Sequence, residues 1–395
     1  AEAEAWEAAF GFYRHAAQQA VDRFALREAA QLFGCALAAA HRLPEDAASM
    51  SSTLDVVFAL RNVLWATGRF AEILEHMVEA ERLAERLSEP VRLGWVSAYR
   101  AASHWQLGEP QHALDAATSA LEVAKAHSER DLAVAAEFYL GCLHATSGAV
   151  DASADCFAAV VARLPGTAAT EKCGLPFAPA IIARSWLIWA HAERGDFAAA
   201  DHNAAEAMAL AEASGLPFNI AHVCYDIGYC EIQRGDPAAA IAVLDRGLKL
   251  IDRWEMTYLR PFTLGFLGYA HLRDGAAETG LAHLVEAVGD YDRINLGLFR
   301  ALVEAQHAEA LLRTGRRGEA LDALYLAERR ARSRGELGHE GFCHIVRGDA
   351  FAGRDREQAA ASFARALEVA TTLRNAPMTA RCQQALAANA PPLDG

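Results

Sequence analysis

A glycine that recurs at a nearly constant interval is the strongest constraint on how this chain of 395 residues can fold. The interval is 40 residues in five of six steps and 47 residues in the other. The recurring glycines are Gly68, Gly108, Gly148, Gly195, Gly235, Gly275 and Gly315. Each ends a stretch of helical apolar periodicity, where a residue that readily adopts positive φ can close one helix before the next begins. The sequence therefore predicts a repeated unit of helix, tight turn and helix.

Small residues follow the turn glycine at two further repeating positions. The first position, five or six residues after the glycine, holds Ala113, Ala200, Ala240, Gly280 and Ala320. The second position, seven residues later, holds Ala120, Ala207, Gly247, Ala287 and Ala327. Small side chains there let the paired helices approach closely, and large residues between them, such as Phe157 and Leu244, fill the seam.

This pattern is that of the tetratricopeptide repeat, but its period exceeds the usual length of about 34 residues, so we expect longer helices. One further unit precedes the regular set, around Phe24 to Ala36, and another follows it, around Ala359 to Leu367. We predict an all-α, right-handed superhelical solenoid of about nine antiparallel helix pairs. It forms a single domain over residues 1–388 with a last short helix near 376–388, and we expect the tail 389–395 to be disordered.

The 47-residue step contains seven extra residues within 164–179. Pro165, Gly166, Gly174 and Pro176 lie in this segment and prevent helix continuation. We therefore predict a loop that projects from the solenoid. It is either a longer connector or a loop that contacts a ligand.

Composition excludes several classes of partner. The formal net charge of −14 opposes binding to nucleic acid or to an anionic membrane surface. No run of about 18 apolar residues is present that could span a bilayer. The eight cysteines are scattered without a CxxC pair, which predicts reduced, mostly buried thiols and a cytoplasmic protein. The chain opens at Ala1 without Met, which we interpret as a piece of a longer polypeptide; a cleaved signal peptide explains this less well.

Three segments resemble a known type of repeat array. They are residues 60–70, residues 92–99 and residues 174–197, the last of which reads GLPFAPAIIARSWLIWAHAERGDF. They are similar to the C-terminal, MalT-like tetratricopeptide repeats of bacterial signal-transduction ATPases and class III adenylate cyclase-type multidomain proteins. The resemblance implies that the repeats sense a ligand or partner and switch a neighbouring ATPase or cyclase domain. Neither catalytic domain is present in this chain.

A search for catalytic or metal-binding motifs finds none that is complete. The three lysines, at 125, 172 and 249, do not follow a phosphate-binding glycine loop, and no Gly-x-Ser-x-Gly elbow occurs. His339 and His344 are five residues apart, so a helix would separate them by about 140° and one zinc ion would not reach both. We predict that the chain is not an enzyme and has no cofactor and no metal site.

Histidine recurs four residues before the turn glycine. His104, His144, His191 and His271 occupy this position, and Glu231 replaces histidine in the remaining repeat. Repeat symmetry would place them in one helix layer. They either serve as partly buried polar groups between neighbouring helices or form a pH-responsive or metal-binding column.

The first helix of each pair lines the concave surface of such a solenoid. The repeat register then gives a candidate concave binding surface of Trp105, Phe138, Trp189, His222, Tyr225, Tyr229, Phe262, Tyr269, Arg273 and Glu309. Aromatic side chains on one surface suit a peptide, a helix or an apolar small molecule, although aromatic residues at helical spacing also serve as core. We expect the stretch from Trp189 to Tyr269 to contribute most.

A basic cluster contrasts with the acidic composition. Arg313, Arg316 and Arg317 occupy one turn and form a candidate docking patch for an acidic partner domain. Solvated arginines near helix ends would also explain the cluster, because cations complement the helix dipole.

Two functions fit these observations. The first is a non-catalytic regulatory scaffold that binds a protein or peptide segment, such as a neighbouring ATPase or cyclase domain; a homo-oligomer is also compatible with the sequence. The second is a sensor that binds a small metabolite in an aromatic groove. A deep enclosed pocket near Trp189 and Tyr229 would favour the sensor, whereas a long open groove would favour the scaffold.

Overall fold

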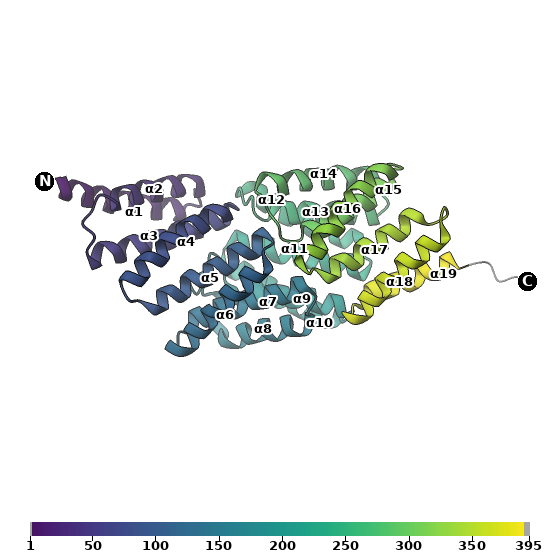
Figure 1. Cartoon of the computed structure of the whole chain (residues 1–395), viewed down its shortest axis with the longest axis horizontal. Coiled ribbons are helices and arrows are strands. Elements are labelled where there is room, and N and C mark those ends of the chain that lie inside the picture. The colour runs from purple at the N-terminus through teal and green to yellow at the C-terminus, as the bar shows by residue number, and fades with distance from the viewer. Residues whose placement is uncertain (1, 391–395) are drawn as a thin grey trace, which may run out of the picture.

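The computed structural model describes residues 2–390 and consists of α-helices joined by short turns, with no strand in this part of the chain (Figure 1). The helices are α1 Glu2–Asp22, α2 Leu26–Ala40, α3 Ala47–Ala66, α4 Phe70–Arg86, α5 Pro90–Leu107, α6 Pro110–His127, α7 Arg130–Ser147, α8 Val150–Arg163, α9 Pro179–Arg194, α10 Phe197–Ser214, α11 Pro217–Arg234, α12 Pro237–Arg253, α13 Arg260–Arg273, α14 Ala277–Arg293, α15 Arg300–Arg313, α16 Arg317–Arg334, α17 Leu337–Phe351, α18 Arg356–Thr372 and α19 Ala376–Asn389. The predicted all-α solenoid is confirmed: α1 to α18 form nine antiparallel pairs and α19 ends the array. We predict that residues 389–395 are disordered. Residues 391–395 lie outside the described residues, and Asn389 is the last residue of α19.

The turns and the helix seams follow the repeat pattern. Gly108 and Gly235 end α5 and α11 with φ of 77° and 88°, values that a residue without Cβ adopts at little cost. Helices α13 and α14 approach so closely that backbone lies against backbone. A Cβ on Gly280 would lie 2.6 Å from the carbonyl oxygen of Gly268, so only glycine fits there.

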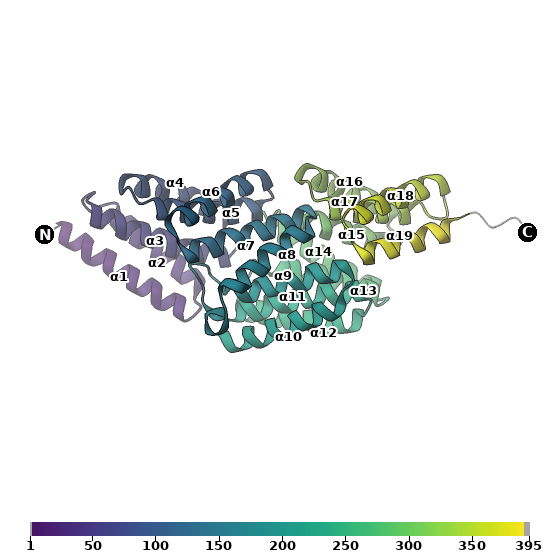
Figure 2. The same ribbon diagram turned by 90° about the horizontal axis from the view of Figure 1, so that it is seen from below.

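The array coils along its long axis so that later repeats return to earlier ones (Figures 1 and 2). Helix α17 contacts α7, and α19 contacts α9. The backbone amides of Gly297 and Leu298 both donate to the carbonyl oxygen of Gln106, at 2.7 and 3.1 Å. The Thr257 hydroxyl donates to the carbonyl oxygen of Thr67 at 3.0 Å. Hydrogen bonds therefore join two successive turns of the superhelix.

Aromatic side chains fill the space between these turns. The ring of Phe299, which precedes α15, lies 5.9 Å from the ring of Trp186 and 5.1 Å from that of Trp189, both on α9. All three residues are buried. The interior of the superhelix at this level is thus a packed core and not an open groove.

The inserted segment 164–179 does not project, contrary to our expectation. It forms a short 3₁₀ helix, Gly166–Thr170, and then packs back onto the solenoid. Phe177 is 1% exposed, and its ring lies 5.2 Å from the rings of Trp65 and Phe138. The segment packs against the solenoid because it contains Leu175 and Phe177, whose apolar surface a projecting loop would leave exposed to water.

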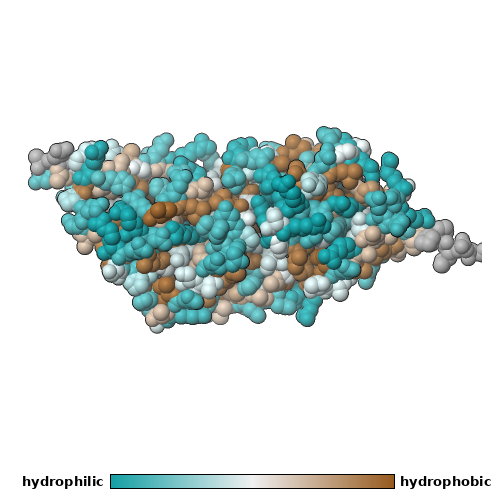
Figure 3. Space-filling model, in the orientation of Figure 1, coloured by the Kyte–Doolittle hydropathy of each residue, from teal (hydrophilic) through white to brown (hydrophobic). Residues whose placement is uncertain are grey.

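The outer surface is mainly polar. On the face shown in Figure 3, hydrophobic residues appear as separate patches among hydrophilic ones. Within residues 2–390, no helix is both long and apolar enough to cross a membrane. The eight cysteines are unpaired, and six of them are buried, as predicted.

Candidate ligand cavity between two turns of the superhelix

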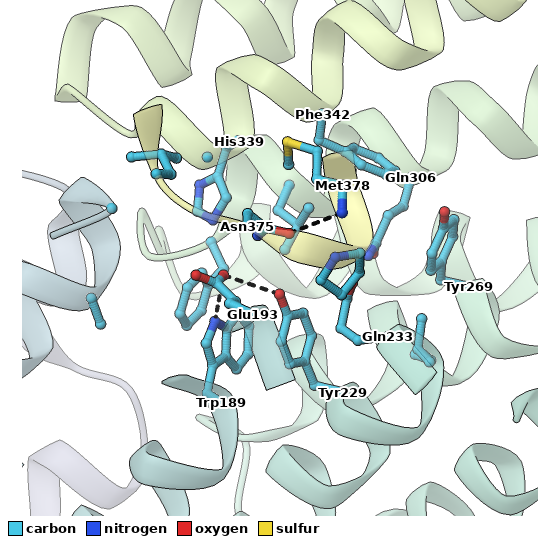
Figure 4. A pocket seen from close by; sticks show the side chains of 18 of the residues that line it. Trp189, Glu193, Tyr229, Gln233, Tyr269, Gln306, His339, Phe342, Asn375 and Met378 are labelled. Atoms are coloured by element: carbon cyan, nitrogen blue, oxygen red, sulfur yellow. Dashed lines mark hydrogen bonds between the residues drawn. The ribbon is translucent and has the colours of Figure 1, made fainter. Parts of the chain in front are cut away.

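A cavity of about 140 Å³ lies where α17 and α19 return to the first helices of the middle repeats. In Figure 4, Trp189, Glu193 and Tyr229 lie on one side of the cavity, and His339, Phe342 and Met378 lie on the other. One wall comes from α7, α9, α11 and α13, and the opposite wall from α15, α17 and α19. The cavity therefore exists only when the two turns are in contact.

The first wall is built from two repeating positions. The position six residues before the turn glycine supplies Trp189, Tyr229 and Tyr269, and the position two residues before it supplies Thr146, Glu193, Gln233 and Arg273. Residues four apart lie on one face of a helix, one turn above another. Each of three consecutive repeats therefore presents an aromatic ring with a polar side chain beside it.

Trp189 is the centre of the aromatic part. It stacks on Tyr229 with the ring centroids 3.4 Å apart and the planes at 6°, and it stacks on Phe299 at 5.1 Å and 17°. Rings held on both faces lose little further conformational freedom when a ligand binds. This part of the wall is preorganised.

The polar part of the cavity contains two acceptors. Oε1 of Glu193 accepts hydrogen bonds from Nε1 of Trp189 at 2.9 Å and from the Tyr229 hydroxyl at 3.1 Å. Gln306 is 3% exposed, and its Oε1 has no hydrogen-bond partner within the described part of the chain. A buried acceptor without a donor costs about 1–3 kcal/mol, so Gln306 leaves a place for a ligand or water that donates.

The connection from α18 to α19 closes the cavity. Asn375 caps α19 by accepting from the amide of Met378 at 3.0 Å. Further along α19, Arg381 donates to the Tyr269 hydroxyl at 2.9 Å and lies 3.0 Å from Oε1 of Glu309. These contacts join the last helix to α13 and α15.

Glu193 should make the stability of the chain depend on pH. Burial raises the pKa of its carboxyl above the ordinary value of 4.5, so the folded chain holds a proton that the unfolded chain releases. Stability from this group is therefore lost as the pH rises from about 4.5 through the raised pKa. We expect Glu193→Gln, which keeps an acceptor for Trp189 and Tyr229, to melt about 2 °C above the parent chain at pH 8 and level with it at pH 4. Melting curves across this range would contradict the assignment if the difference did not grow with pH.

The predicted concave residues divide into two groups. Trp189, Tyr229, Tyr269 and Arg273 line the cavity. The remaining six lie elsewhere in the packed interior and are buried: Trp105, Phe138, His222, Tyr225, Phe262 and Glu309. The expectation of an exposed concave surface at these residues is corrected by the structure, because the turns of the superhelix pack against each other. Arg273 is the exposed member of the set.

Several lining residues were missing from the sequence prediction. Glu193 and Gln233 could have been found, because they occupy the same repeat position as Arg273. Gln306, His339 and Arg381 come from the returning turn, and no repeat position indicates that they would face Trp189.

The arginines of the predicted docking patch have contacts within the chain. Arg316 donates twice to Glu319, at 2.8 and 2.5 Å, and Nε of Arg317 donates to the carbonyl oxygen of Ala350 at 2.9 Å. Arg313 is exposed and lies 4.0 Å from Oε1 of Glu309. A docking role for this patch stays a prediction.

Two of the histidines that precede the turn glycines, His104 and His271, interact within their own repeats. Nδ1 of His104 is 2.6 Å from Oε2 of Glu109, and the ring of His271 stacks on that of His283 at 5.5 Å. With His112, His104 and Glu109 offer three possible metal-ligand atoms within 4.8 Å of one another. The His104–Glu109 hydrogen bond accounts for this exposed arrangement without an ion, and the absence of a metal site stays a prediction.

The fold defines the class of protein: the chain is a tetratricopeptide-repeat-like α-solenoid. It is similar to a Rap protein complexed with Competence and Sporulation Factor, with a TM-score of 0.66 and 12% identity over 94% of this chain and 99% of that one. It is also similar to aspartyl phosphate phosphatase F from Bacillus subtilis, with a TM-score of 0.53 and 12% identity over 93% of this chain and 95% of that one.

A third similar structure is a signal transduction ATPase with numerous domains, from Pyrococcus horikoshii, that has a tetratricopeptide repeat sensor. The TM-score is 0.52 and the identity 11%, and the alignment covers 87% of this chain but 49% of that protein. No protein-family model matches the sequence, and no curated protein matches it. The tetratricopeptide assignment is thus supported by the fold, while the MalT-like resemblance stays a prediction.

Proposed function

We propose that this chain is a non-catalytic regulatory module that binds a small ligand in the cavity between two turns of its superhelix. The observation that carries the proposal is the cavity at Trp189 and Tyr229, which is partly open to solvent but bounded by two turns of the superhelix, while aromatic side chains fill the interior beside it. A cavity of about 150 Å³ accommodates one benzene ring, so 140 Å³ suits a ligand built around a single ring or a short chain.

Ligand binding in this position would act on the shape of the array. The two walls come from different turns, so a ligand that contacts both stabilises the state in which the turns are joined. A ligand shifts a conformational equilibrium by its differential affinity for the two states. The ends of the solenoid, α1 and α19, would transmit this shift to a neighbouring domain, and the sensor-bearing ATPase of similar fold supports such an arrangement.

Binding of a protein or peptide segment is the second candidate function. The similar Rap protein is complexed with Competence and Sporulation Factor, and another similar structure is the Cut9–Hcn1 hetero-tetramer, with a TM-score of 0.54. In this chain, the docking patch of Arg313, Arg316 and Arg317 is the proposed contact for an acidic partner. One similar protein is called a phosphatase, but a shared fold does not transfer catalysis. A cytoplasmic location remains part of the proposal.

Filling the cavity should abolish ligand binding without unfolding the chain. Gly338 lines the cavity on α17, and a Cβ there would lie 3.7 Å from Leu373, another lining residue. We expect the parent chain recovered from its source cells to carry a small-molecule adduct in native mass spectrometry, and Gly338→Leu to lack this adduct.

The matched control is Gly318→Leu, an exposed helical glycine on α16 with nothing within 4 Å of its Cβ. This variant should retain the adduct. An adduct that survives in Gly338→Leu, or a parent chain that carries only a protein partner, would contradict the sensor and favour the second candidate.

A further inference from the structure

We propose that the ligand of the cavity is a small organic ammonium compound, whose charged nitrogen pairs with Glu193 and whose apolar part lies against Trp189 and the rings around it. This inference rests on the proposed function, because it names the chemical class of the ligand for the same cavity. It follows from which hydrogen-bonding groups of the lining are already satisfied and which are not.

The carboxylate of Glu193 is only partly used by the protein. Its two donors, Trp189 and Tyr229, both bind Oε1, which leaves Oε2 for a ligand. The two donors fix the carboxylate at the edge of the stacked rings. A carboxylate held in this way is a site for a hydrogen-bond donor, and a charged donor makes the stronger bond.

Gln306 adds a second acceptor from the opposite wall. It is nearly fully buried and lines the cavity, yet its Oε1 accepts no hydrogen bond from the described residues. Oε2 of Glu193, which neither Trp189 nor Tyr229 uses, and Oε1 of Gln306 are thus two acceptor atoms in the cavity, and they indicate a ligand with N–H or O–H groups at two places. A ligand that offered only acceptors, such as a simple carboxylate, would leave both unsatisfied.

The aromatic lining accommodates the apolar part of the ligand. Both faces of Trp189 are covered, by Tyr229 and Phe299, and the guanidinium carbon of Arg381 lies 5.4 Å from the ring centroid of Phe342. These rings therefore offer apolar surface and ring edges, not free faces that would bind a cation. Figure 4 shows the rings of Trp189 and Tyr229 directly beside the Glu193 carboxylate. An apolar group can lie against the rings while a charged nitrogen attached to it reaches the carboxylate.

The positive side chains of the lining do not oppose this assignment. Arg381 is paired with Glu309 and Asp349, and Nδ1 of His339 lies 2.9 Å from Oε2 of Glu336. Arg273 is exposed, where water screens its charge. Glu193 is the carboxylate of the lining. His339 on the opposite wall and Arg194, which does not line the cavity, favour its charged form, but the side-chain hydrogen bonds that it accepts come from Trp189 and Tyr229.

The test compares amines with alcohols of the same shape. We would measure the affinity of the chain for tyramine against tyrosol, phenethylamine against 2-phenylethanol, and butylamine against butanol by isothermal titration calorimetry at pH 8. We expect at least one amine to bind about tenfold or more tightly than its alcohol, because a hydrogen bond to a charged group exceeds a neutral one by about this factor. Glu193→Gln should remove the difference within the pair.

Glu231→Gln is the matched control. Glu231 is also a partly buried glutamate whose pKa is raised by burial, but it pairs with Arg234 on α11 and does not line the cavity. This variant should keep the preference for the amine. Three pairs in which no amine binds more tightly than its alcohol, or a preference that survives in Glu193→Gln, would overturn the ammonium assignment.

The outcome separates the two proposals. Alcohols that bind as well as amines, together with a native adduct that Gly338→Leu removes, would leave the cavity as a ligand site and overturn only the ligand class. Loss of the amine preference in Glu193→Gln combined with its retention in Glu231→Gln would support the ammonium assignment directly.

Discussion

Gly297→Ala should lower the melting temperature of this chain by about 2–3 °C, because overpacking by one methyl group typically costs 1–3 kcal/mol and 1 kcal/mol shifts the melting temperature of so long a chain by little more than about 1 °C. A Cβ on Gly297 would lie 2.3 Å from the carbonyl oxygen of Leu107 and 2.6 Å from the amide nitrogen of Gly108. Both neighbours are backbone atoms, so no side-chain rotation relieves the overlap. The two turns must separate, and the hydrogen bonds to the carbonyl oxygen of Gln106 lengthen with them.

The control for this variant is Gly289→Ala, eight residues earlier. Gly289 is an exposed helical residue of α14 with nothing within 4 Å of its Cβ. Alanine there should stabilise the chain by about 0.5–1 kcal/mol through helix propensity. Hydrogen exchange at Gly297 and Leu298 distinguishes the two effects, since it should accelerate only in Gly297→Ala. Unchanged exchange and an unchanged melting temperature would show that the turns are not held together at this point.

The repeat unit could be predicted from the sequence because its causes are local. Gly108 ends its helix through its own backbone conformation, and the small residues after it act on the partner helix a few residues away. Contacts between turns have a different origin. Gln106 and Gly297 are 191 residues apart, and the pitch that brings them together is the sum of small rotations over several repeats. The pitch of the superhelix therefore cannot be predicted from the residue pattern of a single repeat.

The same argument explains what was found and missed at the site. The repeat register assigns Trp189 and Tyr229 to the first helices of their pairs, and both are buried in the structure; whether this layer faces solvent depends on the pitch of the superhelix. Glu193 is predictable in principle, since it lies one helical turn after Trp189 on the same face. Gln306 and Arg381 are not, because they reach the cavity only through closure of the superhelix.

Arg381→Met should cost about 3–5 kcal/mol, the range expected when one partner of a buried ion pair is removed. Glu309 is 1% exposed. Nη2 of Arg381 lies 3.0 Å from its Oε1, whereas Nη2 of Arg313 lies 4.0 Å from the same oxygen. The variant also removes a donor to the Tyr269 hydroxyl and a salt bridge to Asp349. We expect α19 to detach, with faster hydrogen exchange over residues 376–389 and loss of one wall of the cavity.

Arg365→Met is the control for removing a paired arginine. Arg365 and Glu368 form an ion pair on α18 with both side chains more than half exposed, so its loss should change stability by less than about 0.5 kcal/mol. An effect as large as that of Arg381→Met would mean that burial of Glu309 is not the cause.

The double variant Arg381→Met with Glu309→Gln separates charge from packing. A neutral amide at position 309 can still accept from the Tyr269 hydroxyl, which now donates to Oε2 of Glu309 at 3.1 Å. If the cost of Arg381→Met is that of an unpaired buried carboxylate, the second substitution should restore at least half of the lost stability. If the cost is lost packing of the arginine stem on Phe342, whose ring centroid lies 5.4 Å from the guanidinium carbon, the double variant should be no more stable than Arg381→Met alone.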